Sequence, residues 1–342
     1  MTRSRVNDSR RRADPTRSRA DEARSGGDAA RARAGTAWRA GAGRPGALVA
    51  LLNNLDGVFQ RSVLQGAGEV AAAHGLPLEP VALGGLSATE VGTLLDRALG
   101  TGRAAQGAGG ARGAQGAWVA RGALVLSSAL RDADLAKLAA AGLPVTLVSH
   151  HSAAPGQPTV MFDNHQGVKQ LMQHVVSDCG RRRPVYIGGD ASQLDGRERE
   201  LAFRDELLRH DLRVPEGHML VGGFTPDLAR RALREFVAAG NDFDAVVAAD
   251  YLMAIAAAET LGQAGVRVPE DVVVVGYGDG PEAEAAGVTT VAADVVELGR
   301  RAARQLVAQL SSERAIGGRT LLSTHLVRRA SSCRARAPSD LV

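Results

Sequence analysis

Cysteine is scarce in this chain of 342 residues, which contains only Cys179 and Cys333, far apart and without CxxC spacing. Such a pair indicates neither a disulfide framework nor a zinc site. We therefore expect two unpaired thiols in a reducing cytosol. No acidic residue stands at ligand spacing beside the adjacent pair His150 and His151, so we also predict no metal site.

Long apolar runs are missing as well. No stretch approaches the roughly 18 apolar residues of a membrane span. The basic N-terminus is not followed by the apolar core and cleavage site of a signal peptide. Aromatic residues make up only 3% of the chain, whereas Ala, Gly and Arg are abundant. These absences predict a cytoplasmic protein with no membrane partner.

Catalytic and cofactor motifs are also absent: the chain has no GxSxG, no HExxH and no Ser-His-Asp order. The stretch "DVVVVGYGDG" (271–280) resembles a strand that enters a phosphate-binding loop. A dinucleotide loop opens a crossover helix and ends its motif in glycine. Here Pro281 replaces that glycine, and about two helical turns precede the next apolar run, "VTTVA". We therefore predict the rim of a ligand cleft, no cofactor and no enzyme.

The net charge of +4 conceals an uneven distribution. Residues 1–45 contain 12 Arg against five acidic residues, so they carry +7 and the rest of the chain carries −3. Without apolar periodicity, this segment is predicted to be a disordered tail. An Arg-rich tail binds phosphate backbones non-specifically, although a solvated extension or a misplaced start codon is the plainer interpretation. The low-complexity block 100–120 is predicted to be a flexible loop and 334–342 a second tail.

From residue 46 onward, strand and helix patterns alternate. "ALVALL" suits a buried strand, and "FQRSVLQGAGEVAAAHGL" after it has helical spacing. Ser87 and Glu90 form a capping-box pattern at the start of the helix "SATEVGTLLDRAL". The alternation continues through "DVVVVGY", which predicts an α/β class with two doubly wound parallel-sheet subdomains. Such a pair commonly holds a ligand in a cleft between the units, at the carboxyl ends of the strands.

Five ordered stretches carry a resemblance to a known family. They are "FDNHQGVKQLMQHVV" with "CGRRRPVYIGG", then "RERELAFRDEL", then "FDAVVAADYLMAIAAAETLGQAGVRVPEDVVVVGYGDG", then "GVTTVAADVVELGRRAARQL" and finally "LVRRASS". Through them, residues 46–332 resemble the lactose-repressor (LacI) family of bacterial transcription regulators, whose effector-binding part has the periplasmic-binding-protein type I fold. The resemblance implies a small-molecule effector, often a sugar or nucleobase, and a homodimer.

The resemblance also implies that the subdomains are discontinuous in sequence. Crossovers would fall near Asp163, Ala292 and Ser323. The N-terminal subdomain would then comprise residues 46–162 plus 293–323, and the C-terminal subdomain residues 163–292 plus 324–333. The helix "VVELGRRAARQLVAQL" would return to the N-terminal subdomain.

Several ligand contacts are carried over from the family pattern. Arg199 matches an arginine that grips ligand hydroxyls or a carboxylate with its planar donor fork, although a surface arginine without a ligand is the plainer alternative. Phe224 matches an aromatic that stacks on the ligand, or else it is ordinary core. Asp250 and Asp279 match acidic framework positions. Gly278 stands where the family places a ligand-holding aspartate, and Ala249 stands where it places asparagine.

Further candidates lie at strand ends of the N-terminal subdomain. Phe59 falls at the predicted mouth of the cleft, and Asn53, Asn54 and Asp56 share the loop before it. Ser149 and His150 follow the strand "PVTLV" and would partly compensate for the two missing polar groups. Because paired polar groups discriminate between polyols, their loss suggests an atypical sugar or weak binding.

Nothing in residues 1–45 resembles the family's helix-turn-helix. Two functions stay open. The first is a LacI-type regulator that senses a sugar-like effector, with DNA contacted by the tail or a partner. The second is a cytoplasmic sensor module without specific DNA binding.

Overall fold

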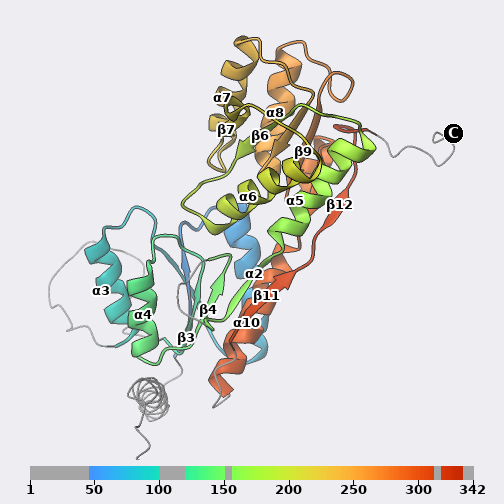
Figure 1. Ribbon diagram of the computed structural model, residues 1–342. Helices are drawn as coiled ribbons and strands as arrows, with labels where there is room; N and C mark the ends of the chain where they lie inside the picture. The colour runs from blue at the N-terminus through green and yellow to red at the C-terminus, as the bar shows by residue number, and fades with distance from the viewer. Residues whose placement is uncertain (1–45, 101–119, 151–155, 312–316, 334–342) are drawn as a thin grey trace, which may run out of the picture.

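The computed structural model describes residues 46–100, 120–150, 156–311 and 317–333. The predictions for the N-terminal tail, for residues 101–119 and for residues 334–342 lie outside these ranges. The described chain forms two lobes, each built on a six-stranded sheet (Figure 1). This confirms the α/β class with two mainly parallel sheets.

The first sheet has the order β11-β5-β4-β3-β1-β2, with every pair parallel. Its strands are β1 (Leu48–Leu52), β2 (Leu78–Ala82), β3 (Gly122–Val125), β4 (Val145–Val148), β5 (Thr159–Phe162) and β11 (Arg319–Leu322). The second sheet has the order β12-β10-β9-β8-β6-β7. Its strands are β6 (Pro184–Gly188), β7 (Met219–Val221), β8 (Ala245–Ala248), β9 (Val273–Tyr277), β10 (Thr289–Ala292) and β12 (His325–Val327). Only the edge strand β12 runs antiparallel in the described sheets, against β10.

All five residues of β1 are buried, and successive residues pack into apolar clusters on opposite faces of the first sheet. Leu48, Ala50 and Leu52 belong to one apolar cluster, whereas Val49 and Leu51 belong to another. Because successive side chains point to opposite faces of a strand, both faces of β1 are buried. The first cluster includes residues of α2 (Val58–Ala73) and α10 (Val295–Ser311), and the second includes residues of α3 (Ala88–Ala98) and α4 (Asp132–Ala140).

Helix α10 is held in the first lobe by close contact with α2. At Gly66 a Cβ atom would lie 1.9 Å from the carbonyl oxygen of Val296, and at Gly299 it would lie 2.2 Å from that of Val63. These glycines let the two backbones approach each other. The predicted return of this helix to the first lobe is therefore seen directly. The capping box of Ser87 and Glu90 at the start of α3 is also confirmed.

The second lobe has one continuous apolar core, dominated by valine and alanine of β8 and β9. Helix α5 (Asn164–Gln173) packs against α6 (Leu194–Arg209), and α7 (Pro226–Ala238) packs against α8 (Tyr251–Gln263). Helix α9 is short, spanning only Pro281–Ala285 between β9 and β10.

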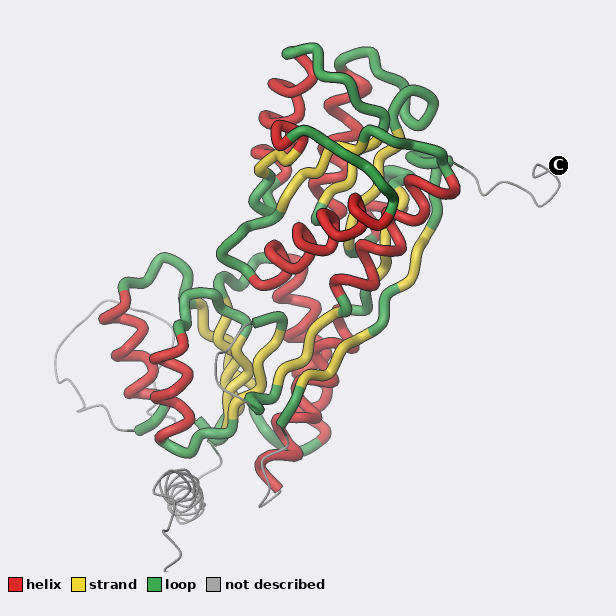
Figure 2. The backbone as a smooth tube through the Cα atoms, viewed as in Figure 1, coloured by secondary structure: helices red, strands yellow, loops and turns green. Residues whose placement is uncertain are grey.

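The chain passes between the lobes at three places: from β5 to α5, from β10 to α10, and from β11 to β12 (Figure 2). Each passage leaves a sheet at the carboxyl end of one of its strands. Because parallel strands point the same way, the carboxyl edges of both sheets face the junction of the lobes. The subdomain boundaries given above stay a prediction.

The two cysteines contradict the prediction of unpaired thiols, since Cys179 and Cys333 are joined in a disulfide with Sγ–Sγ of 2.05 Å. They are separated by 154 residues, and pairing over such a distance depends on the fold rather than on local spacing. The segment after β12 runs back beside the end of α5 and brings Cys333 to Cys179. No helix of the described residues has the length and apolar character needed to cross a membrane.

Candidate functional site

The topology of both sheets points to one place for a ligand. In the first sheet β1 lies between β2 and β3, and in the second β6 lies between β7 and β8, so the winding direction reverses at β1 and at β6. In open α/β sheets, ligands bind at the carboxyl edge where this reversal occurs. Both reversals meet the junction of the lobes, and six of the eight predicted site residues lie within three residues of a strand's carboxyl end.

Arg199 is the central residue at the carboxyl edge of the second sheet, called the second-lobe edge below; the corresponding edge of the first sheet is the first-lobe edge. Arg199 lies on α6 and is only 8% exposed. Its Nε donates to Asn164 Oδ1 at 2.9 Å, its Nη1 donates to the carbonyl oxygen of Ala249 at 2.8 Å, and its Nη2 lies 3.5 Å from Asp195 Oδ2. A guanidinium has five N–H donors in a fixed plane. These three contacts fix the plane of the group and use only part of its donor capacity.

Two aromatic rings flank this guanidinium. Its Cζ lies 3.8 Å from the ring centroid of Tyr277 and 5.8 Å from that of Phe224, both within the range of cation–π attraction. Phe224 has a positive φ of 57° and its ring covers Gly189, where a Cβ would lie 2.2 Å from Phe224 Cζ. Burial raises the pKa of Tyr277, against the opposing charge of Arg199. The phenol therefore stays neutral beside the cation.

Asp250 lies near the charge of Arg199, but its carboxylate caps the N-terminus of α8. Its carboxylate is the N-cap and accepts from the backbone N–H of Met253 at 3.0 Å. Burial raises the pKa of Asp250, although the Met253 hydrogen bond and the Arg199 charge act the other way. The residue fixes the start of α8 at the edge of the site.

The carboxylate of Asp279 is paired with Arg329. Arg329 donates to both of its oxygens at 2.8 Å, and Thr290 Oγ1 donates to Oδ1 at 2.8 Å. Burial raises the pKa of Asp279, but these hydrogen bonds and the Arg329 charge outweigh burial and hold the pKa below its ordinary value. This ion pair attaches the end of β9 to the segment after β12.

Gly278 has a φ of +80°, and a Cβ there would lie 3.3 Å from Tyr251 Cδ1. Side-chain-bearing residues are strained at this φ. The backbone itself therefore favours glycine where the family pattern has an acid. Burial raises the pKa of Tyr251, whose hydroxyl donates to Glu282, to about 12.

The first-lobe edge is neutral. Asn53 Oδ1 accepts from Ser127 Oγ at 2.7 Å and from the backbone N–H of Ser128 at 3.0 Å, which joins the ends of β1 and β3. Ser149 follows β4 with a φ of 47°, and its buried Oγ has no hydrogen-bond partner among the described residues.

Phe59, at the start of α2, is partly buried and packs against the core. Asn54 Oδ1 accepts from Gly57 N–H, and the carbonyl oxygen of Asp56 accepts from Arg61.

The structure therefore brings Arg199 and Phe224 into contact, places Asp250 near the Arg199 charge and pairs Asp279 with Arg329. It adds Asn164, Asp195 and Tyr277, which the sequence analysis did not single out. Asn164 stands next to the predicted crossover, and Tyr277 ends the strand of "DVVVVGY". Their positions in the chain were the only sequence signal that could have identified them. A shallow depression of about 220 Å³ between α5 and α6 is lined mainly by charged side chains, including Lys169, Asp205 and Arg209. It lacks the topological reversal and the aromatic rings, so we assign the site to the strand ends.

Comparison with known proteins agrees with this architecture. Residues 174–332 match the family described as periplasmic binding protein-like domain. The chain is 36% identical over 195 residues to the HTH-type transcriptional regulator CelR of Thermobifida fusca, covering 56% of this chain and 57% of that protein. It thus spans little more than half the length of this curated relative.

Solved structures extend the match across both lobes. The transcriptional regulator CelR–cellobiose complex superposes with a TM-score of 0.71 at 30% identity, over 84% of this chain and 86% of that one. The lac repressor dimer bound to operator and the anti-inducer ONPF superposes with a TM-score of 0.72 at 19% identity, over 87% of this chain and 98% of that one. This match shows that the two proteins share a fold. These relatives are transcriptional regulators rather than enzymes. The chain therefore belongs to the lactose-repressor family, and its two described lobes form the effector-binding domain of that family.

Proposed function

We propose that this protein is a LacI-type transcriptional regulator that senses a small, sugar-like effector between its two lobes. The observation that carries the proposal is the Arg199 guanidinium, fixed by Asn164 and the Ala249 carbonyl and flanked by Tyr277 and Phe224. A preorganised donor beside aromatic rings is well suited to a polyhydroxylated ligand, because C–H faces stack on the rings while hydroxyls accept from Arg.

The first-lobe edge would complete the site. Ser149 Oγ is buried and has no hydrogen-bond partner within the described part of the chain, and a buried hydroxyl gains free energy when it finds one. Asn53, held by Ser127 and Ser128, offers an amide at the end of β1 in the same sheet. A ligand that bridges these groups and Arg199 would favour a closed arrangement of the lobes over an open one.

A chain of polar contacts joins the two halves. Asn164, which accepts from Arg199, donates to Glu198 Oε2 at 2.9 Å, and Glu198 Oε1 lies 3.4 Å from Arg319 of β11 in the first sheet. A ligand that shifts Arg199 would act on the junction through this chain. In a dimer, closure would change how the first lobes are oriented relative to each other.

Ligand identity is best tested by thermal unfolding with a panel of sugars. Cellobiose comes first, because a related regulator is known in complex with it; other disaccharides, monosaccharides and nucleosides follow. We expect a concentration-dependent rise in Tm with one class of saccharide, since a ligand that binds only the folded state stabilises it. The absence of any shift across the panel would contradict a sugar-like effector.

The role of Arg199 is tested with Arg199→Lys, which keeps the charge but loses the planar fork. We expect at least about a tenfold loss of affinity, or about 1.4 kcal/mol. Arg197→Lys, on an exposed turn of the same helix, is the matched control. Equal affinity of Arg199→Lys and the wild type would remove Arg199 from the site.

DNA binding and a cytoplasmic sensor role without DNA are distinguished by gel shift with the region upstream of the protein's own gene. A specific complex that survives moderate salt and responds to the effector supports the regulator. Binding that disappears with salt and with deletion of residues 1–45 indicates only non-specific phosphate contacts. Sedimentation of the same chain tests the proposed homodimer.

A further inference from the structure

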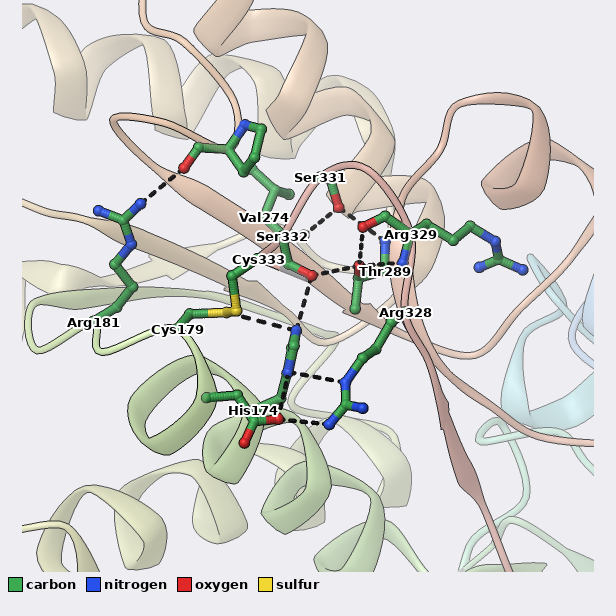
Figure 3. The surroundings of a disulfide bond; sticks show 12 residues. His174, Cys179, Arg181, Val274, Thr289, Arg328, Arg329, Ser331, Ser332 and Cys333 are labelled. Atoms are coloured by element: carbon green, nitrogen blue, oxygen red, sulfur yellow. Dashed lines mark hydrogen bonds and ion pairs between the residues drawn. A yellow bond between two sulfur atoms is a disulfide. The ribbon is translucent and has the colours of Figure 1, made fainter. Parts of the chain in front are cut away.

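The second lobe brings three potential metal ligands together at its far side. His174, Cys179 and Cys333 each offer a ligand atom, and the three atoms lie within 4.8 Å of one another (Figure 3). His174 belongs to the π-helical turn His174–Asp178 that continues α5, and Cys179 follows directly. Cys333 comes from the segment after β12. π-helical turns are rare and occur often at functional sites.

The cluster lies opposite the proposed effector site. Ser332 Oγ is 2.6 Å from the hydroxyl of Thr289, the first residue of β10, and Cys179 lies five residues before β6. The cluster therefore lies at the amino edge of the second sheet, whereas the effector site lies at the carboxyl edge. Ligands at the two places would not share residues.

The hydrogen bonds of His174 fix its ring and its tautomer. Nδ1 lies 3.0 Å from Asp178 Oδ2, and Arg328 Nη2 holds the same oxygen at 2.6 Å. Because an ionised carboxylate only accepts, and because Asp178 Oδ2 lies closer to Nδ1 than the Arg328 Nε at 3.5 Å, we assign the hydrogen to Nδ1. The lone pair is then on Nε2, which faces Ser332 Oγ at 2.8 Å and Cys179 Sγ at 3.6 Å. Histidines that ligate metals commonly have their second nitrogen bonded to a carboxylate in this way.

We propose that reduction of the Cys179–Cys333 disulfide creates a Zn²⁺ site with both thiolates and His174 Nε2 as ligands. Tetrahedral Zn²⁺, with bonds of about 2.3 Å to sulfur and about 2.0 Å to nitrogen, sets neighbouring S and N atoms about 3.6 Å apart and two S atoms about 3.8 Å apart. Cys179 Sγ already lies 3.6 Å from Nε2. The remaining movement is the separation of the two sulfurs after their bond has been reduced.

Ser332 has to release Nε2 for the ion to bind, and its contact with Thr289 Oγ1 remains available to it. Water or the Ser332 hydroxyl fills the fourth position. The ligand set is Cys₂His, and thiolate and imidazole are the donors that Zn²⁺ prefers. Local spacing does not reveal this ligand set, because Cys333 lies far along the chain from His174 and Cys179.

The redox chemistry balances with a dithiol as reductant. The dithiol supplies two electrons and two protons, the S–S bond becomes two thiols, and the reductant becomes a disulfide. Binding of Zn²⁺ then displaces one proton from each thiol. The disulfide and the metal-bound form exclude each other, and both fasten the segment after β12 to the end of α5.

The proposal is tested on the full chain without any substitution. Oxidised protein and anaerobically reduced protein are titrated with Co²⁺, whose thiolate complexes absorb in the near ultraviolet, and the Co²⁺ is then displaced with Zn²⁺. We expect a cobalt–thiolate band only after reduction, lost on addition of Zn²⁺. A reduced chain without the band, or equal Zn²⁺ binding by oxidised and reduced chains, would overturn the site.

Variants then assign the ligands, with folding checked by far-ultraviolet circular dichroism. Cys179→Ser and Cys333→Ser should each lose most of the band. Asp178→Asn should weaken Zn²⁺ affinity about 10- to 100-fold in chelator competition, because it no longer orients His174. His165→Asn, on the exposed face of α5, is the matched control and should leave the affinity unchanged. Equal losses in Asp178→Asn and His165→Asn would contradict the assignment.

Discussion

The two lobes repeat one topology but carry different chemistry at their carboxyl edges. The strand orders β5-β4-β3-β1-β2 and β10-β9-β8-β6-β7 are the same pattern, with the reversal at β1 in the first lobe and at β6 in the second. The second edge holds a buried arginine, two aromatic rings and two acidic groups. The first edge holds an amide and hydroxyls. Shared topology therefore fixes where a site lies, whereas local residues fix what it binds.

The difference also concerns how firmly each edge is held. Arg199 is bound from three elements: Asn164 of α5, Asp195 of its own helix and the carbonyl oxygen of Ala249 after β8. On the first edge, Asn53 and Ser127 join two strand ends, while the Ser149 hydroxyl is unpartnered among the described residues. We infer that the second lobe presents a rigid, charged half-site and the first lobe an adaptable, neutral one.

Replacement of the buried Arg199 should have the largest effect on the stability of the second-lobe edge. Arg199→Ala leaves Asp195, the Asn164 carbonyl and the Ala249 carbonyl without their donor in a buried place. Loss of one partner of a buried ion pair commonly costs 3 kcal/mol or more. We expect urea unfolding to show a loss of about 3 kcal/mol in the free energy of unfolding, with an unchanged m-value.

Arg197→Ala is the control for that substitution. Arg197 is exposed on the same helix and donates to the carbonyl oxygens of Ala191 and Ser192. We expect a change within about 1 kcal/mol, because exposed polar contacts contribute little. Similar losses for both variants would show that α6 itself, rather than the buried guanidinium, is the sensitive feature.

The charged character of the second lobe should also appear as pH dependence. The pKa of Asp279 is depressed, so its bonds to Arg329 stabilise the fold above the ordinary carboxyl pKa of about 3.9 and are lost as the pH falls through the lower, native value. Asp279→Asn should lower the unfolding free energy by about 1 kcal/mol at pH 7. The wild-type and variant curves should converge below about pH 4.

Asp242→Asn provides the comparison for this pH series. Its side chain is 77% exposed beside Arg183, so we expect a difference within about 0.5 kcal/mol across the range. A constant offset between Asp279→Asn and the wild type down to the acid limit would contradict the assigned role of the ionised carboxylate.

Alternation and capping in the sequence were enough to predict the scaffold. The buried apolar strands, the capping box at Ser87 and the short segment after Pro281 all appear as expected. These features depend on neighbours within a few residues. The antiparallel pairing of β12 was not anticipated, because it depends on the direction in which the chain re-enters the second lobe.

The site was harder to predict for the same physical reason. Arg199 was identified through its family position, but its partners Asn164 and Ala249 lie 35 and 50 residues away along the chain. Asp279 matches an acidic framework position of the family, but its partner Arg329 lies 50 residues further along the chain. The prediction of unpaired thiols was wrong for the same reason, because the two bonded cysteines lie 154 residues apart. Local pattern gives no information about such pairings.

The smallest expected effect separates two serines of the neutral edge. Ser127→Ala removes the hydrogen bond to Asn53 Oδ1 and should lower the free energy of unfolding by about 1 kcal/mol. Ser149→Ala removes a buried hydroxyl without a partner among the described residues, so we expect a change within about 0.5 kcal/mol, or slight stabilisation. Urea unfolding at one pH measures both. A loss at Ser149 as large as that at Ser127 would mean that its hydroxyl is already satisfied in the free protein, and the adaptable half-site would then have to be sought at Asn53 alone.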